Sequence, residues 1–389
     1  MSGSLNSWLS QRSFALSAHT IPGYSGPFEA VRDFLILRNA KSLETLEFPL
    51  DVRSPRRTIK RQWKHGDQIQ DREWRRPNKP PWTYPLDALW QPSLIPDVWM
   101  AFDVLTIAGA IRRSRRAGSV VVGWHVDFVP PEHQGLAGIP YRMLDRYGQT
   151  HVDLAIELSQ DALVARTNLH TRSARNALVV PMGISGNLHH PTPQQFQEKR
   201  VTYVGSLNTR ATAGMLGQII QGLYNVDPDI KFDVVGKGTE FASLVELQEA
   251  VPTLTVHGFL SDSQVRVLLT RSTVGLAPYA QDENSFSRFG DPGKIKMYLA
   301  AGLPVVMTAV PPNARHLAEK DVALLIDSPE DRHAWTQQVI SLTRDSDRWM
   351  RMSSAAHLCA QEFTWNNLLE TFFEELRKLY EREKLVGNE

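Results

Sequence analysis

One stretch, residues 285–308 with the sequence SFSRFGDPGKIKMYLAAGLPVVMT, constrains the fold more than any other part of this chain. It begins as a polar loop broken by glycine and proline, continues as an amphipathic run after Asp291, and turns after Gly302 into the apolar run 303–307. Proline suits the first turn of a helix, glycine suits the position after its last turn, and a short β-branched run is typical of a strand buried in a parallel sheet. The pattern therefore predicts a loop, a helix and a buried strand of an α/β fold.

The start of this predicted helix is also a candidate anion site. Lys294 directly follows a loop that contains Gly290, Pro292 and Gly293. Free backbone N–H groups, the positive end of the helix dipole and an ammonium group would together hold a phosphate or diphosphate. The alternative is an ordinary corner between helix and strand with a solvated lysine, and this stretch alone does not decide between the two.

The length of 389 residues predicts two domains of roughly 150–200 residues, because one ordinary hydrophobic core does not grow that large. The Gly- and Pro-rich stretch 182–197 interrupts the apolar periodicity and marks the boundary. We expect a first domain over residues 1–185 and a second over residues 186–362. The clearly amphipathic run 363–389 is expected to form a terminal helix.

The composition is that of a globular protein, with 42% apolar and 22% charged residues and a net charge of +1. The single cysteine, Cys359, excludes an internal disulfide and fits a reducing cytoplasm. No apolar run approaches the roughly 18 residues needed to span a bilayer, and the N-terminus lacks the apolar core of a secretory signal. We expect a cytoplasmic protein, and peripheral contact with the inner face of a membrane stays open.

Residues 53–90 depart from the periodicity, because arginines and lysines are interleaved there with Trp63, Trp74 and Trp82. The segment 58–74 predicts a β-hairpin that turns around Gly66, since glycine after a polar residue is typical of such turns. Basic and aromatic residues together fit a nucleic acid, an anionic membrane surface, a phosphate-bearing acceptor or a solvated loop. The remaining sequence has no other nucleic-acid signature, so we favour a membrane or acceptor and expect no nucleic acid.

Gly26 lies in a glycine loop between a predicted strand near residues 12–18 and a predicted helix over residues 28–37. The absence of a side chain would let this backbone approach a ligand. An ordinary turn is the alternative, and from this motif alone it is favoured.

His125 and Asp127 follow the β-branched run 120–122, where a predicted strand ends and its loop begins. Ligands of open parallel sheets bind beyond the carboxyl ends of the strands. The two side chains are therefore candidates for binding a substrate hydroxyl or for acid–base chemistry, and a structural histidine with a capping aspartate is the alternative. Elsewhere, His170, His189 and His190 lack the spacing of ligands on one helix face, so we expect no metal site.

The second half repeats the order of strand, glycine and helix. Gly205, Gly236 and Gly258 each follow or end a predicted strand. A single Gly-x-Gly is weak evidence for a nucleotide site, but several strand-end glycines at one edge of a sheet are better evidence.

The succession of GSL, VGKG, HGF, APY and DPGKIKMYLAAGLPVV at these strand ends resembles the C-terminal domain of GT-B glycosyltransferases of group 1. The first half, with SGPFEAVRDFL, VDFVPPE and Tyr141 before LDR, is similar to a bacterial polysaccharide branch of that family. The terminal FTW and long helix match the helix that in GT-B proteins commonly crosses back to the N-terminal domain. The resemblance covers the chain apart from residues 53–90.

The resemblance implies an α/β fold of two Rossmann-like domains whose parallel sheets face each other across a cleft. It implies transfer of a sugar from a nucleotide-sugar to an acceptor hydroxyl, with retention of the anomeric configuration, in polysaccharide or glycoconjugate biosynthesis. The departing diphosphate would be stabilised without a metal, and the nucleotide-sugar would be a substrate rather than a cofactor. The implied donor-binding residues are Gly26, Gly205, Arg210, Gly258, Phe259, Tyr279, Gly290, Pro292, Gly293 and Lys294.

Within that set, the resemblance assigns the diphosphate to Arg210 and Lys294 and the nucleobase to the backbone of Gly258 and Phe259. His125 or Asp127 would lie near the transferred sugar. The implied acceptor is a glycan or a lipid-linked sugar.

One departure concerns the acidic residues of the family. Many relatives carry two glutamates where this chain has Phe289 and Met297. Asp291 is our candidate substitute, and Asp282 and Glu283 in the same loop are the other two. Inversion with His125 or Asp127 as the base, a nucleotide-sugar epimerase of the same fold and a non-catalytic partner subunit therefore remain alternatives.

Overall fold

A computed structural model describes residues 2–20, 26–49, 56–65, 68–77, 87, 89, 92–93, 95–114, 118–131, 138–170, 174–212, 214–281 and 286–386. The chain forms two compact units. Unit 1 comprises Met1–Pro181 and Trp365–Glu389, and unit 2 comprises Met182–Thr364. The sequence had placed the two boundaries after residues 185 and 362.

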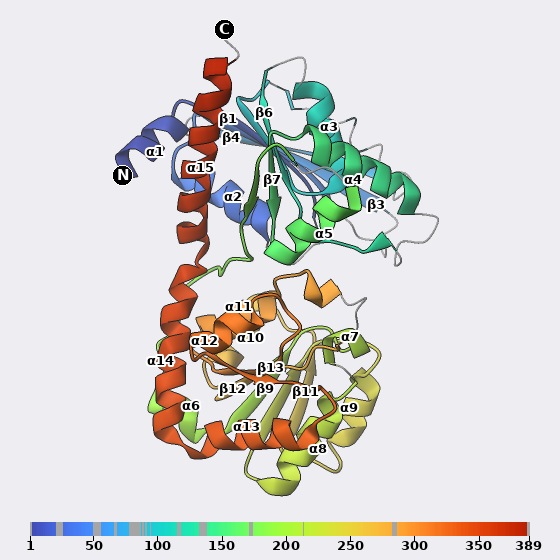
Figure 1. Ribbon diagram of the computed structural model, residues 1–389, viewed down its shortest axis with the longest axis vertical. Coiled ribbons are helices and arrows are strands. Elements are labelled where there is room, and N and C mark those ends of the chain that lie inside the picture. The colour runs from blue at the N-terminus through green and yellow to red at the C-terminus, as the bar shows by residue number, and fades with distance from the viewer. Residues whose placement is uncertain are drawn as a thin grey trace. The chain divides into compact units, whose positions relative to one another are not determined.

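Unit 1 is built on an eight-stranded sheet with the order β4-β3-β2-β1-β5-β6-β7-β8 (Figure 1). The strands from β2 through β1 to β8 run parallel, and β3 and β4 are added antiparallel at one edge. Strands β5, β6 and β7 are buried along their whole length and apolar except for Glu157 at the end of β7, as expected for a parallel sheet covered on both faces. The bounds are β1 Ser13–Thr20, β2 Ser42–Pro49, β3 Arg56–His65, β4 Gln68–Pro77, β5 Val98–Ala101, β6 Val120–Trp124, β7 Leu154–Glu157 and β8 Ala177–Val179.

The last helix of the chain belongs to unit 1, where it packs on the first two helices of the chain. Phe373 of this helix stacks on Phe34 with ring centroids 5.2 Å apart, and Phe372 contacts Trp124 at 5.1 Å. The expected return of the C-terminal helix to the first domain is thereby confirmed. The helices are α1 Ser2–Leu9, α2 Pro27–Leu37, α3 Val104–Ser114, α4 Ile139–His151, α5 Gln160–His170 and α15 Trp365–Val386.

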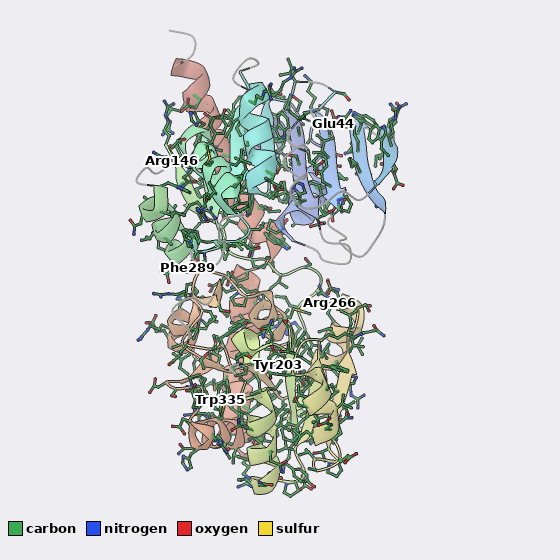
Figure 2. All side chains as sticks on the ribbon, turned by 90° about the vertical axis from the view of Figure 1, so that its right-hand side faces the viewer. Glu44, Arg146, Tyr203, Arg266, Phe289 and Trp335 are labelled. Atoms are coloured by element: carbon green, nitrogen blue, oxygen red, sulfur yellow. The ribbon has the colours of Figure 1, made fainter. Side chains whose placement is uncertain are left out.

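The basic and aromatic stretch contains the predicted hairpin. Strands β3 and β4 pair from Arg56 with Pro77 to His65 with Gln68, and the two turn residues lie outside the described part. Arg61 lies 5.6 Å from the ring centroids of both Trp63 and Trp74 and pairs with buried Glu44 of β2 (Figure 2). The hairpin therefore joins the sheet of unit 1 through the antiparallel pairing of β3 with β2 and through the ion pair of Arg61 with Glu44. Trp82 lies outside the described residues.

Unit 2 is built on a six-stranded parallel sheet with the order β11-β10-β9-β12-β13-β14. Its strands are β9 Arg200–Val204, β10 Lys231–Val235, β11 Leu254–Gly258, β12 Val274–Ala277, β13 Val305–Thr308 and β14 Ala323–Ile326. Its helices are α6 Pro193–Gln197, α7 Thr209–Thr212, α8 Leu216–Val226, α9 Phe241–Leu247, α10 Asp262–Leu269, α11 Gly293–Ala300, α12 Ala314–Glu319, α13 Arg332–Arg344 and α14 Ser346–Glu362, with a 3-10 turn at Phe286–Arg288. Two apolar clusters fill the space between sheet and helices.

Residues 286–308 form the predicted loop, helix and strand. Helix α11 is followed by Gly302 at φ 68°, a conformation that glycine adopts without strain, and then by β13. Tyr298 anchors α11 on the sheet, because its hydroxyl accepts from Val204 N at 2.9 Å and donates to Leu276 O at 3.0 Å. A side chain at Gly275 would lie 2.6 Å from the Tyr298 ring, so the glycine makes room for this anchor.

No helix in the described part of the chain is long and apolar enough to cross a membrane.

Candidate functional site

Three glycines gather at the carboxyl edge of the unit 2 sheet. Gly205 and Gly236 follow the neighbouring parallel strands β9 and β10 with φ near 140°, and Gly258 ends β11 with φ 68°. A side chain at Gly236 would lie 1.8 Å from the Gly205 carbonyl oxygen, so only glycine fits there. The strand-end glycines predicted from the sequence thus form one continuous backbone edge.

Lys294, the second residue of α11, extends over this edge. Its Nζ lies 3.0 Å from the Tyr203 hydroxyl, to which it donates, and 4.2 Å and 4.7 Å from the ring centroids of Tyr203 and Tyr279. A Cβ built on Gly205 would lie 3.1 Å from the same nitrogen. Figure 2 labels Tyr203 inside unit 2. The aromatic rings and the bare glycine therefore hold the ammonium at the end of β9.

The charge of Lys294 has no anionic partner among the described residues, since no carboxylate there forms an ion pair with it. Burial of most of the side chain lowers its pKa from 10.5 to about 7. Tyr279 is buried beside it, and its hydroxyl has no hydrogen-bond partner in the described part of the chain. Buried polar groups are normally satisfied, so an unpaired cation beside an unsatisfied hydroxyl indicates a site for an anionic ligand.

The first turn of α11 completes this edge. Pro292 is the N-cap residue, and a Cβ on Gly293 would meet no atom within 4 Å. The first amides of a helix have no intrahelical acceptor, and here open space lies next to them. Gly290, two residues before the cap, is half-buried.

Asp291, predicted to substitute for a catalytic acid, is buried in unit 2. Its carboxylate accepts from Met182 N at 2.7 Å and Asn313 Nδ2 at 2.8 Å, and it lies 3.2 Å from Lys296 Nζ. The carboxylate is thus buried and occupied by groups of unit 2. Met297, where relatives carry a glutamate, packs against the apolar cluster instead.

The remaining unit 2 candidates are less defined. Phe259 follows Gly258 and is 67% exposed. Arg210 lies on α7, and its side chain is outside the described part, as are Asp282 and Glu283.

Two unit 1 candidates lie after β6 and differ in exposure. His125 is 2% exposed, and neither ring nitrogen has a hydrogen-bond partner among the described residues. Burial and, to a lesser extent, the nearby Arg166 charge lower its pKa to about 3, so the imidazole is neutral. The structure thus places the His125 ring in the interior, whereas Asp127 is exposed.

Gly26 is the N-cap residue of α2, and its amide donates to Glu29 Oε2 at 2.8 Å. The loop before it, residues 21–25, lies outside the described part.

Sequence reasoning missed a buried cluster of charges behind the loop after β6. Arg166 donates to Glu157 and to Asp145 at 2.6 Å each and to the Asp127 carbonyl oxygen at 2.8 Å. His170 contacts Asp145 at 2.9 Å. The spacing of Arg166 and His170, four residues apart on α5, places both on one helix face and was a usable signal.

The carboxylates of this cluster differ in their pKa. Although burial opposes ionisation, Arg166 and His170 lower the pKa of Asp145 to about 2. Burial raises the pKa of Glu157 to about 7 in spite of the same arginine. The cluster is thus a partnered interior network.

No group of three histidines, cysteines or carboxylates in the described part of the chain could hold a metal ion. His190 packs on His357 at 4.0 Å.

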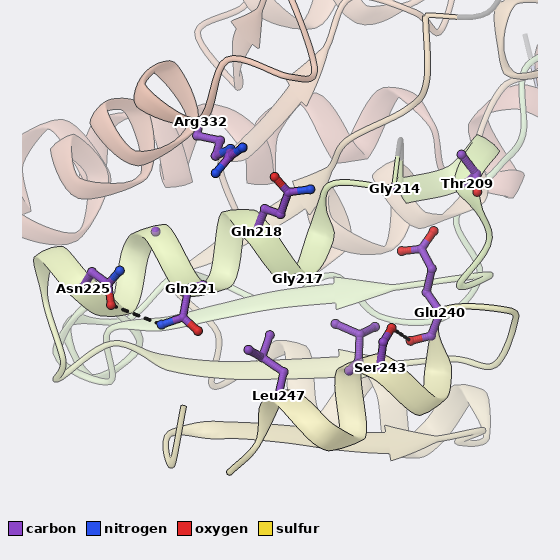
Figure 3. A pocket seen from close by; sticks show the side chains of 12 residues that line it. Thr209, Gly214, Gly217, Gln218, Gln221, Asn225, Glu240, Ser243, Leu247 and Arg332 are labelled. Carbon is purple, nitrogen blue, oxygen red and sulfur yellow. Dashed lines mark hydrogen bonds between the residues drawn. The ribbon is translucent and has the colours of Figure 1, made fainter. Parts of the chain in front are cut away.

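A cavity of about 550 Å³ lies elsewhere in unit 2, between α8 and α9 (Figure 3). Gln218, Gln221, Glu240, Ser243 and Arg332 lie around it. None of the candidate residues predicted from the sequence lines this cavity. Glu240 accepts from Thr212 of α7, which connects the cavity wall to the helix that carries Arg210.

Residues 198–345 match the family model of glycosyl transferases group 1. No curated protein sequence matches the chain. Several solved structures share its fold over nearly the whole length. Sucrose-phosphate synthase from Thermosynechococcus elongatus matches with a TM-score of 0.71 and 15% identity, covering 95% of this chain and 99% of that chain.

A structure described as trehalose-6-phosphate from E. coli bound with UDP-2-fluoro glucose matches with a TM-score of 0.65 and 14% identity, covering 95% and 99%. Anabaena HepE in complex with UDP matches with a TM-score of 0.63 and 15% identity, covering 94% and 100%. At such identities these neighbours establish the fold, and the family model covers most of unit 2. The chain is a glycosyltransferase of GT-B fold, and its residues 198–345 carry the domain of glycosyl transferases group 1.

Proposed function

We propose that this enzyme transfers a sugar from a nucleotide-sugar donor to an acceptor hydroxyl and binds the donor diphosphate at the start of α11. The observation that carries the proposal is the Lys294 ammonium, unpaired among the described residues and held over Gly205 between Tyr203 and Tyr279. Complexes of the structural neighbours with UDP and UDP-2-fluoro glucose support a nucleotide-sugar donor.

The proposed chemistry follows from the charge that develops on the leaving group. When the bond between sugar and diphosphate breaks, negative charge grows on the diphosphate oxygens. A fixed ammonium and the first amides of α11 stabilise that charge more than they stabilise the ground state, which lowers the barrier. We propose that Arg210 adds a second cation and that the reaction needs neither a metal nor a separate cofactor.

Gly258 and Phe259, at the end of β11, are proposed to contact the nucleobase. Tyr279 would offer its unsatisfied hydroxyl to the diphosphate, and backbone groups of Gly205, Gly290 and Gly293 would line the site. Gly26 is proposed to approach the donor phosphates through its backbone.

We propose retention of the anomeric configuration, as the family resemblance implies. A side-chain base for inversion finds less support, because burial lowers the pKa of His125 to about 3, which makes it a weak base, and Asp291 pairs with Lys296. Asp127 is the exposed carboxylate left for a base in that alternative. NMR assignment of the product anomer decides between the two, and an inverted product would refute retention.

The acceptor is proposed to be a glycan or a lipid-linked sugar in polysaccharide or glycoconjugate biosynthesis. Because the edge strand of the hairpin carries Arg72 over the ring of Trp74, we propose that it contacts an anionic membrane surface at the cytoplasmic face.

A screen of nucleotide-sugars for slow hydrolysis without acceptor tests the donor proposal. We expect hydrolysis of at least one nucleotide-sugar by the wild-type enzyme and loss of most of it in Lys294→Ala. Lys231→Ala is the matched control, because Lys231 begins β10 at the opposite edge of the same sheet and pairs with Glu198. Equal activity of all three proteins would exclude Lys294 from the site.

A further inference from the structure

Asp291 and Lys296 form a buried ion pair that the proposed reaction does not use. Lys296 is 2% exposed, its Nζ lies 3.2 Å from Asp291 Oδ1, and it lies 3.5 Å from the ring centroid of Phe363. Burying two charges is costly unless they are paired and hydrogen-bonded, so an apolar pair of similar volume would serve packing equally well. The pair therefore calls for a role beyond filling the core.

The partners of this pair lie where the chain crosses between the two units. The chain enters unit 2 at Met182, whose amide donates to Asp291 at 2.7 Å, and leaves it after Thr364, next to Phe363. The two crossing segments are also joined to each other, because Ile184 N donates to Phe363 O at 2.7 Å. One ion pair thus contacts both crossing segments.

The same pair flanks the proposed diphosphate site. Asp291 directly precedes the N-cap residue Pro292, and Lys296 lies two residues after Lys294 on α11. Consecutive residues of one short helix turn cannot shift independently, so a movement of the first turn changes the distance between Asp291 and Met182. We infer that Asp291 and Lys296 are positioning residues that couple diphosphate binding at α11 to both crossing segments. This inference rests on the proposed donor site.

Hydrogen exchange tests the coupling in the wild-type protein without any substitution. The probe is UDP, with GDP, ADP, CDP and TDP as further nucleoside diphosphates. We expect a bound nucleotide to slow exchange in peptides that cover residues 182–184 as well as in those that cover 293–297. Helix α8, whose buried side chains belong to the other apolar cluster of unit 2, is the internal control and should not change.

Two variants show whether the pair carries the effect. Asp291→Asn keeps the shape but removes the charge that binds Lys296 and Met182, and Lys296→Met keeps the length of the side chain without its charge. Each is expected to bind the nucleotide about tenfold more weakly and to lose most of the protection at residues 182–184 while retaining some at 293–297. Asn313→Ala removes only one hydrogen bond to Asp291 and serves if the other variants fail to fold.

The outcomes separate the coupling from the donor site itself. If nucleotide binds and depends on Lys294 but residues 182–184 keep their exchange rate, the inference is refuted and the proposed function stands. Unchanged affinity and unchanged protection in the variants would equally refute it. If no nucleoside diphosphate binds to the wild-type protein, the proposed function fails and the inference fails with it.

Discussion

The start of α11 in unit 2 and the loop after β6 in unit 1 both lie at the carboxyl edge of a parallel sheet, but their charges are partnered in opposite ways. Behind the loop after β6, Arg166 is bound by Asp145, Glu157 and the Asp127 carbonyl. At α11, Lys294 has no carboxylate partner among the described residues. Buried charges that pair with one another therefore indicate a structural scaffold. A buried charge without an oppositely charged partner indicates a ligand site.

The largest expected effect concerns the scaffold. Arg166→Met leaves Asp145 and Glu157 buried without their common partner, and breaking a buried pair from one side typically costs about 3–5 kcal/mol. We expect the free energy of unfolding in urea to fall by that amount. Arg175→Met is the matched control, because Arg175 is 73% exposed and its ion pair with Glu383 lies at the surface. Equal stability of the two variants would show that the cluster is not a scaffold.

A smaller effect is expected from pH at the ligand site. Lys294 has a pKa of about 7 in the structure, below its ordinary 10.5, so the free protein loses this proton as the pH rises through 7. Diphosphate binding favours the charged ammonium form of Lys294. Above pH 7 the lysine must therefore take up a proton when the diphosphate binds. The affinity for UDP is then expected to fall by up to about tenfold per pH unit between pH 7 and 9. Titration at several pH values measures this fall, and Lys294→Ala should show none. A wild-type affinity that stays constant would mean that the ammonium remains charged.

The smallest effect is expected at the hairpin of unit 1. Arg72→Ala should weaken association with anionic vesicles by about 1 kcal/mol, the usual contribution of one basic residue near such a surface, and added salt should weaken it further. Lys60→Ala is the control, because Lys60 and Arg72 lie on opposite faces of the hairpin. Arg72 lies across from Arg61, the neighbour of Lys60 on β3, and neighbouring residues of a strand point to opposite faces. Equal binding to neutral and anionic vesicles in a flotation assay would refute the membrane proposal. The hairpin would then be either a surface that binds the acceptor or a solvated surface.

Local patterns predicted the elements well, because each depends on a few neighbouring residues. Pro292, Gly293 and Gly302 set the ends of α11, and the position of Gly66 in the sequence predicted the hairpin of β3 and β4. The apolar spacing of α15 predicted a buried face, which Phe372 and Phe373 form.

The partners of charged residues could not be predicted in the same way. Asp291 was a candidate acid because of its place in the loop, but its carboxylate is bound by Met182, more than a hundred residues earlier in the sequence. His125 was a candidate base at a strand end, but its burial depends on how the surrounding elements pack. Only the three-dimensional structure shows which of two lysines on one helix, Lys294 or Lys296, has a carboxylate partner.

Calorimetric titration of UDP into the wild-type protein, Lys294→Ala and Lys231→Ala tests the central claim most directly. We expect Lys294→Ala to lose about 1.5–3 kcal/mol of binding free energy, the usual contribution of a hydrogen bond to a charged group, and Lys231→Ala to bind like the wild type. Thermal unfolding should show that both variants are folded. Unchanged UDP affinity in folded Lys294→Ala would contradict the claim that this lysine binds the donor diphosphate.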